Sequence, residues 1–402
     1  MSEINSTKLL KGIMADYFKS FFPSEGEKPK VAWCTSVGPS EILTAFGYQV
    51  YYPENHGAML GATRTSNECI PQATSLGYSP DICSYLTSDI GSHLLGKTPL
   101  TRAYGIPHPP RPDVLVYSTN QCHEVQEWFS YYGREFNVPV LGIHPPWKAG
   151  PMTTLQLAHV KDQYLELIKN LETLNKTSFD YDRFHQVLGN SATTSKLWRE
   201  FLNKMVNRPS PATFFDSCIQ MGPAVVLRGL PEANDYYRQL NQEMDQKITA
   251  GEGALEKERI RLFWDGMPVW GKLRYFSELF KENASAVVAS TYCNSWVFDF
   301  DLDDPLLSMA RAYTGIFINR SEEVKEKVLA GLIDEYQIDG VIYHDSKTCP
   351  HNSNNRFGLP QRLQQETKVP YLVVDGDLND LRCFSQEQTT TSLEAFVEQL
   401  SE

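Results

Sequence analysis

Two cysteines stand at matching places in two similar stretches of this chain. PDVLVYSTNQC ends at Cys122 and GVIYHDSKTC ends at Cys349, and in each stretch a short apolar run gives way to a polar turn before the thiol. Buried parallel strands are continuous apolar runs of this kind, and ligands bind just beyond their carboxyl ends. We therefore predict two similar α/β halves that direct thiols to one shared site.

A third thiol, Cys83 in SPDICSYLTSDIG, lies at or just before the start of a helical stretch. The dipole at a helix start favours a thiolate. Three thiolates that converge between two halves would suit an iron–sulfur cluster with one open or non-cysteine position. They would equally suit zinc, with His123 or His351 as a further ligand. Spacing along the chain leaves both kinds of metal site open.

Ser36 and Glu54 are candidates for proton transfer and carbonyl binding. Ser36 follows the predicted strand KVAW, and Glu54 lies in a loop predicted at the end of the next strand, YQVYYPEN. Because these strands lie side by side, the hydroxyl and the carboxylate can face one crevice, where one binds a carbonyl oxygen and the other moves a proton. The commoner role of such a carboxylate is to cap a helix or fix a loop. We interpret Ser40 as a helix cap and Glu41 as a carboxylate of the first helical turn.

The segment GSHLLGKT, residues 91–98, matches the phosphate-loop pattern GxxxxGK[ST] letter for letter. A phosphate loop needs a strand before it and a helix that begins at the lysine. Here a helical stretch precedes the segment, and we expect that the following PLTRAYGIPHPP cannot begin a helix cleanly. We therefore predict that this segment does not bind a nucleotide.

The elements that must position these residues are strands alternating with helices, which predicts α/β halves with parallel sheets and right-handed crossovers. Between the halves the apolar period becomes helical, and the recurring residues are Val160, Tyr164, Leu167, Leu171 and Leu174. We predict an N-terminal helical arm (1–29), a first α/β domain (30–153), a helical region (154–257) and a second α/β domain (258–402).

Composition limits the partners of this chain of 402 residues. Its net charge of -12 disfavours binding to nucleic acid and to anionic membranes. The longest apolar runs have the length of strands, and the first residues lack the features of a secretory signal, so we expect a cytoplasmic protein. Eight cysteines without a CxxC pair then favour metal binding or catalysis over disulfides.

These residues resemble the catalytic subunits of the 2-hydroxyacyl-CoA dehydratase and benzoyl-CoA reductase family. The likeness runs in order from about Val31 to the C-terminus, through AWCTSVGPSEIL, VYYPENHGA, GYSPDICSYLTSDIG, NQCHEVQEWFSYYGREFNVPV, LFWDGMPVW, YHDSKTC and VVDGDLNDLRCFSQEQ. Several motifs in one order are specific to the family, although they do not single out one of its members.

The resemblance implies two Rossmann-like α/β domains with helical additions and a [4Fe–4S] cluster between them. The ligands implied for this cluster are Cys83, Cys122 and Cys349, with Ser36 and Glu54 near the thioester of an acyl-CoA substrate. It also implies a related second subunit, in a heterodimer or a homodimer, and a separate ATP-dependent iron–sulfur activator protein.

The activity that the resemblance implies is a lyase reaction of anaerobic metabolism. An (R)-2-hydroxyacyl-CoA loses water through a ketyl radical and becomes an enoyl-CoA. Alternatives are an ATP-dependent benzoyl-CoA (aromatic acyl-CoA) reductase, a double-cubane reductase with Cys34 or Cys293 as further ligands, and an electron-relay subunit. Two residues depart from the family pattern, because Lys347 stands where an arginine is frequent and Pro350 where a basic residue is frequent.

Overall fold

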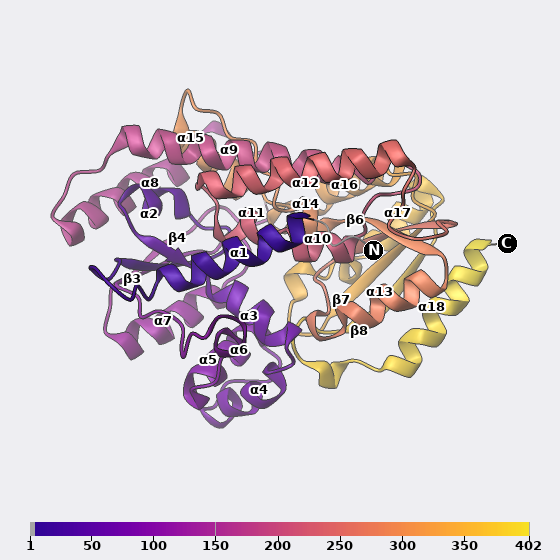
Figure 1. The fold of residues 1–402 in the computed structure, drawn as a ribbon, viewed down its shortest axis with the longest axis horizontal. Helices are drawn as coiled ribbons and strands as arrows, with labels where there is room; N and C mark the ends of the chain where they lie inside the picture. Colours follow the sequence, from indigo (N-terminus) through magenta and orange to yellow (C-terminus); the bar gives the residue numbers. More distant parts are fainter. Residues whose placement is uncertain (1–4, 149, 402) are drawn as a thin grey trace.

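The computed structural model describes residues 5–148 and 150–401, and two separate parallel sheets organise it. The strand orders are β2-β1-β3-β4 and β6-β5-β7-β8, so each strand of the second sheet has its counterpart in the first. Figure 1 shows β3 and β4 on one side of the molecule and β6, β7 and β8 on the other. This confirms the predicted fold of two Rossmann-like halves. The strands are β1 (Val31–Cys34), β2 (Gln49–Tyr51), β3 (Val114–Ser118), β4 (Val140–Ile143), β5 (Ile260–Asp265), β6 (Ser285–Ser290), β7 (Gly340–Ser346) and β8 (Tyr371–Gly376).

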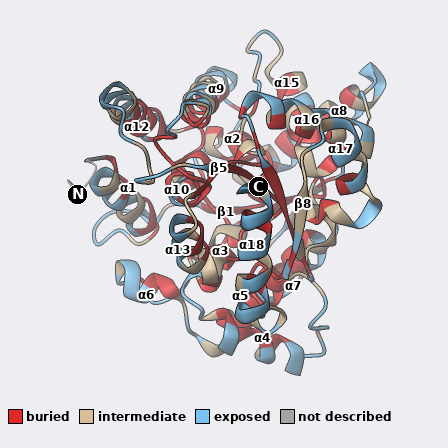
Figure 2. Cartoon of the chain, turned by 90° about the vertical axis from the view of Figure 1, so that its right-hand side faces the viewer, coloured by how far each residue is buried: buried red, intermediate tan, exposed pale blue. Residues whose placement is uncertain are grey.

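Four of the strands consist of residues that must leave water on both faces of the sheet. Every residue of β1, β3, β5 and β6 is buried. Figure 2 shows strands such as β1 and β5 inside a shell of helices whose outer faces are exposed. Burial on both faces explains why these strands are continuous apolar runs without a polar alternation.

Helices surround both sheets. Those of the first half are α1 (Asn5–Ser20), α2 (Ser40–Ala45), α3 (Pro53–Ala62), α4 (Ser66–Ser75), α5 (Ser84–Leu95), α6 (Pro99–Tyr104) and α7 (Glu124–Phe136). Those of the second half are α13 (Leu273–Glu282), α14 (Thr291–Asn294), α15 (Pro305–Thr314), α16 (Glu322–Glu335), α17 (Leu359–Thr367) and α18 (Gln386–Ser401), with short 3-10 turns such as η3 (Pro350–Asn352). Among the described residues, no helix combines the length and the hydropathy needed to cross a bilayer.

A layer of helices follows the first half along the chain and contacts both halves. It consists of α8 (Thr154–Asn175), α9 (Tyr181–Lys204), α10 (Phe214–Gln220), α11 (Gly222–Val226) and α12 (Pro231–Ala250). On α9, the Ser191 hydroxyl donates to Glu41 of the first half at 2.9 Å. On the same helix, the Trp198 indole donates to the carbonyl of Cys293 in the second half at 3.0 Å. Helix α9 therefore joins the two halves.

The helical period predicted for α8 is confirmed in four of its five residues. Val160, Tyr164, Leu167 and Leu171 are buried. Leu174 was predicted to pack with them, but it lies in the last turn of the helix and is 45% exposed. Thr153 and Gln156 form a capping box that starts the helix and satisfies backbone N–H groups of its first turn.

Two local predictions were wrong, and proline explains both. Glu54 was placed in a loop, but it lies in the first turn of α3, which begins at Pro53 directly after the strand. The segment PLTRAY was not expected to begin a helix, but it forms α6 with Pro99 first and the Thr98 hydroxyl accepting the N–H of Leu100. Proline at the first helical position has the required φ and lacks only an N–H that would be unpaired there.

The segment that matches the phosphate-loop pattern has the opposite geometry from such a loop. Gly91 lies inside α5, so a helix and not a strand precedes Lys97. The glycine serves packing, because an added Cβ would lie 1.9 Å from the carbonyl oxygen of Cys69 on α4. Lys97 pairs with the exposed Glu68 at 2.6 Å.

Asp265, at the carboxyl end of β5, makes stability depend on pH. Its buried carboxylate accepts two hydrogen bonds from the Asn354 amide, at 3.1 and 3.0 Å, with Lys325 and Glu322 as charged neighbours. Burial raises the pKa of Asp265 to about 6, and the Asn354 and Thr291 side chains oppose the rise. A carboxyl group with a raised folded-state pKa stabilises the fold most at low pH, and this contribution disappears as pH rises through that pKa.

We therefore expect Asp265→Asn to change the pH dependence of unfolding. Between about pH 4 and about pH 6, the unfolding free energy of the native chain should fall relative to that of the variant by about 3 kcal/mol. Denaturant unfolding of both proteins across this range measures the difference. A constant difference at every pH would show that Asp265 does not titrate in this window.

Candidate functional site

One cavity collects all five residues that the sequence singled out. It has a volume of about 420 Å³, and its lining includes Ser36, Glu54, Cys83, Cys122 and Cys349. The first four come from the first half and Cys349 from the second, so the cavity lies where the halves meet. Exposed lining residues on α1, α3 and α10, namely Lys11, Ala62 and Ile219, mark its opening.

The three cysteines share one local arrangement. Cys83 immediately precedes α5, Cys349 immediately precedes η3, and Cys122 lies two residues before α7. Each sulfur is therefore near the N–H groups of a first helical turn, where negative charge is favoured. For Cys122 the nearby N–H belongs to Val125, and for Cys349 it belongs to Asn352. This repeated arrangement directs three sulfur atoms, which are soft metal ligands, towards the same cavity.

Burial makes the free thiolate costly at all three positions. It raises the pKa of the Cys83 and Cys122 thiols well above the ordinary value, and it raises the pKa of Cys349 to about 12. The charge on one thiolate also raises the pKa of the next, since Cys83 is affected by Cys349 and Cys122 by both. Such thiols ionise readily only when a cation binds them, which is how a metal cluster would act.

Three cysteines in one cavity are a ligand set that an iron–sulfur cluster takes. Within residues 5–148 and 150–401, no group of three or more His, Cys, Asp or Glu side chains is arranged to hold a single metal ion. A cubane cluster needs a different arrangement of ligands. Each thiolate binds a separate iron atom, so the cysteine sulfurs lie farther apart than the ligands of a single ion. His123 and His351, the zinc ligands considered above, both pack against the Trp147 ring, with centroids 5.8 and 5.0 Å away.

Ser36 and Glu54 form one unit at the carboxyl ends of β1 and β2. The backbone N–H of Ser36 donates to the Glu54 carboxylate, and the Gln121 amide donates to its other oxygen. Burial raises the pKa of Glu54 above its ordinary value, and these hydrogen bonds oppose the rise. A carboxylate with a raised pKa beside a buried hydroxyl can exchange a proton with a bound molecule.

Arg228, which the sequence analysis missed, holds the loop that carries Ser36. Its guanidinium donates to the carbonyl oxygens of Ser36 at 2.8 Å and Gly38 at 3.1 Å, and to the Ser40 hydroxyl at 2.7 Å. It also pairs with Glu41 at 3.1 Å, and both charges are buried. Glu41 lies in the first turn of α2 as predicted, but its role is to pair with this arginine.

The remaining cysteines considered as ligands lie elsewhere. Cys34 is fully buried in β1, below the turn at Gly38, where an added Cβ would lie 2.8 Å from its sulfur. Cys293 is buried in α14 and contacts Cys218, which does line the cavity.

Comparison with known proteins identifies the family of this chain. The family model described as 2-hydroxyglutaryl-CoA dehydratase, D-component, matches residues 35–400. The chain belongs to this family. The matched range covers all five candidate residues and every strand except β1.

Three curated relatives of this dehydratase family span almost the same length. The (R)-2-hydroxyisocaproyl-CoA dehydratase alpha subunit of Clostridioides difficile is 29% identical over 406 residues, covering 100% of this chain and 98% of the relative. The lactoyl-CoA dehydratase alpha subunit of Anaerotignum propionicum is 27% identical over 412 residues, with 98% of each chain covered. A benzoyl-CoA reductase subunit of Thauera aromatica is 28% identical over 378 residues, covering 90% of this chain and 87% of the relative.

The two departures from the family pattern have structural roles in this member. Lys347 forms an ion pair with Asp81 at 2.9 Å, which links the segments that precede Cys349 and Cys83. Pro350 is the first residue of η3, so it starts the turn whose N–H faces the Cys349 sulfur. Pro350 therefore shapes the backbone beside a thiol, whereas the Lys347 ion pair is exposed to water and contributes little.

Proposed function

We propose that this protein is the iron–sulfur subunit of an activator-dependent 2-hydroxyacyl-CoA dehydratase, a cytoplasmic enzyme of anaerobic metabolism. The observation that carries the proposal is the gathering of three thiols, a hydroxyl and a carboxylate in one cavity between two sheets. Cys83, Cys122 and Cys349 would hold a [4Fe–4S] cluster. Relatives named as dehydratase alpha subunits support the proposal and favour a related second subunit as partner.

In this proposal the chain's own residues bind the thioester and move one proton. When bound, the cluster supplies an electron that makes loss of the 2-hydroxyl group feasible and then recovers it. The Ser36 hydroxyl donates to the thioester carbonyl oxygen, and Arg228 keeps the Ser36 loop in place. The Glu54 carboxylate takes the proton from C3 and returns it to the hydroxide that leaves from C2, so that the products are an enoyl-CoA and water. The apolar walls exclude bulk water from the site.

The lining also supports a proposal about the acyl group. Besides Glu54 and Glu124, the described lining residues include one cation, Lys11, which is exposed on α1 at the opening. The deeper walls are apolar or aromatic, with Val37, Met267, Trp270, Tyr292, Trp296 and Ile316 among them. A second carboxylate on the substrate would lose its hydration here without gaining a buried cation. We therefore propose an aliphatic or aromatic acyl group without a terminal charge.

An anaerobic assay with the partner subunit, the activator and ATP tests both statements. We expect enoyl-CoA from 2-hydroxyisocaproyl-CoA or phenyllactyl-CoA, with kcat/KM at least ~100-fold above that for 2-hydroxyglutaryl-CoA. Equal or better turnover of 2-hydroxyglutaryl-CoA would contradict the acyl assignment. Iron-loaded protein that turns over no 2-hydroxyacyl-CoA would contradict the dehydratase assignment.

The second candidate function is reduction of an aromatic acyl-CoA. Its support is the relative named as a benzoyl-CoA reductase subunit, together with the rings of Tyr85, Trp270, Tyr292 and Trp296 in the cavity lining. The same assay separates the two, because this activity would consume benzoyl-CoA and leave 2-hydroxyacyl-CoA esters unchanged.

A further inference from the structure

Two cysteine-bearing segments from opposite halves are tied directly to each other. Ser84 follows Cys83 in the first half, and Thr348 precedes Cys349 in the second. The backbone N–H of Ser84 donates to the Thr348 hydroxyl at 3.0 Å, although these residues lie 264 positions apart. The relative position of two thiols therefore depends on a contact between their immediate neighbours.

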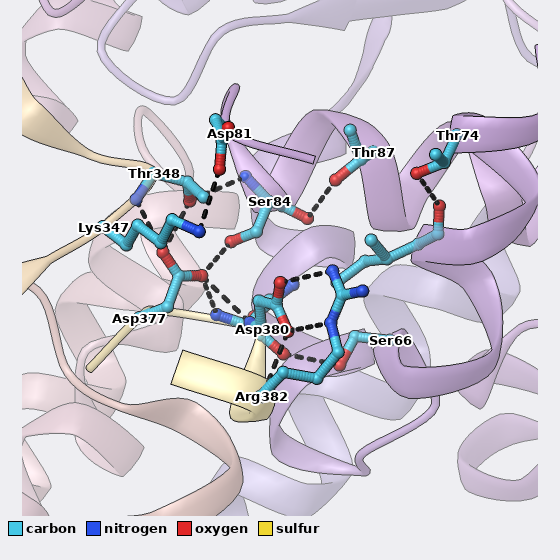
Figure 3. A network of polar contacts seen from close by, with 12 residues as sticks. Ser66, Thr74, Asp81, Ser84, Thr87, Lys347, Thr348, Asp377, Asp380 and Arg382 are labelled. Atoms are coloured by element: carbon cyan, nitrogen blue, oxygen red, sulfur yellow. Dashed lines mark hydrogen bonds and ion pairs between the residues drawn. The ribbon is translucent and has the colours of Figure 1, made fainter. Parts of the chain in front are cut away.

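The carboxylate of Asp377, in the second half, accepts hydrogen bonds from both residues of this contact. Asp377 follows β8, is fully buried, and accepts six hydrogen bonds. Figure 3 shows its carboxylate between Ser84 and Thr348. One oxygen accepts from the Ser84 hydroxyl and from the N–H groups of Asn379 at 3.0 Å and Asp380 at 2.9 Å. The other oxygen accepts from the N–H and the hydroxyl of Thr348, at 2.8 and 2.6 Å, and from the Ser346 hydroxyl at 3.3 Å.

Three of these six donors are backbone N–H groups, which cannot accept, and they face both oxygens, so only a side chain that accepts at both positions satisfies them. An asparagine of the same shape would direct its NH2 group at backbone N–H donors, and a buried donor without an acceptor costs free energy. Charge-assisted hydrogen bonds are also stronger than neutral ones. The carboxylate therefore holds the Ser84 hydroxyl and the Thr348 backbone more rigidly than a neutral side chain would.

We propose that Asp377 is a positioning residue that sets the distance between the Cys83 and Cys349 thiols. The inference rests on the proposed function, in which these thiols hold one cluster. Groups that orient metal ligands from outside affect metal affinity strongly. A fixed negative charge near an iron–sulfur cluster also lowers its reduction potential, because reduction adds a further electron to the site.

A second link between the same segments provides a matched control. Lys347 and Asp81, two residues before Cys349 and Cys83, form an ion pair that Figure 3 shows. Their charged atoms are 2.9 Å apart, and their side chains are 56% and 64% exposed. Exposed ion pairs contribute little because water screens them. Asp81→Asn therefore makes the same chemical change as Asp377→Asn. Because it removes an exposed ion pair, it should not affect iron content or midpoint potential.

The first test measures iron in the full chain, purified anaerobically with its partner. We expect Asp377→Asn to retain less than half of the native iron and its residual cluster to have a more positive midpoint potential. Asp81→Asn should match the native protein in both measurements. Full iron and an unchanged potential in Asp377→Asn would overturn the proposal.

A second pair of variants covers the case in which Asp377→Asn does not fold. Thr348→Val removes the hydroxyl that links Ser84 to Asp377, and Thr348→Ser restores a hydroxyl. Circular dichroism of the iron-free chains shows which variants are folded. We expect iron loss in Thr348→Val and near-native iron in Thr348→Ser, and equal iron in these two variants would overturn the proposal.

An iron-free measurement separates this inference from the proposed function. Dibromobimane, a short reagent that alkylates two thiols, should cross-link Cys83 to Cys349 in the iron-free native chain. Mass spectrometry should find the cross-linked peptide at least threefold less abundant in Asp377→Asn than in Asp81→Asn. A native chain that binds no iron contradicts the proposed function, whereas equal cross-linking in the two variants contradicts the role of Asp377.

Discussion

Cys122→Ala is expected to remove the iron and the activity together. Cys122 lines the cavity with Cys83 and Cys349, and it lies before α7 with the N–H of Val125 near its sulfur. Without it, two cysteines remain for a cubane that normally takes three or four. Losing a direct ligand should cost more than the roughly 10–100-fold loss that follows removal of a residue that only supports a ligand.

Iron and sulfide analysis of the anaerobically purified variant, with dehydratase assays beside it, checks this prediction. The native chain should hold about four irons, and the variant should hold little iron and show no measurable turnover. Cys69→Ala is the control, because Cys69 is fully buried on α4 and is not among the cavity-lining residues. A Cys122→Ala protein with native iron content and native rate would mean that the ligands are other residues.

Glu54→Gln should lower kcat by roughly 10²–10⁴-fold while iron content stays unchanged. The carboxylate is the proposed proton acceptor, and an amide cannot take a proton from carbon. Glu54 makes its hydrogen bonds with Ser36 and Gln121. Replacing the carboxylate by an amide should therefore affect proton transfer more than substrate binding, and KM should change less than kcat.

Steady-state kinetics on the iron-loaded variant measures both parameters. Glu68→Gln is a suitable control, since that carboxylate lies on the surface and pairs with Lys97. The control should keep its native kcat. If Glu54→Gln retained native kcat, another group would have to accept the proton, and the candidate would be the second carboxylate of the cavity, Glu124.

Much of the architecture was predictable because the strands are buried on both faces. The runs VLVYS and GVIYHDS are continuous, and each precedes a cysteine-bearing turn, so the duplication of the two halves is visible in the sequence. Strand and helix boundaries were less predictable. The helix starts at Pro53 and Pro99 were missed, although proline suits the first helical position.

What the sequence determined by itself is the identity and local setting of Ser36, Glu54, Cys83, Cys122 and Cys349, each beside a predicted strand end or helix start. The tertiary structure alone decided what holds them, because Arg228 reaches Ser36 across 192 residues and Asp377 reaches Ser84 across 293. Local pattern depends on neighbours three or four residues away, whereas these buried charges find their hydrogen-bond donors and acceptors only after the two halves have packed together.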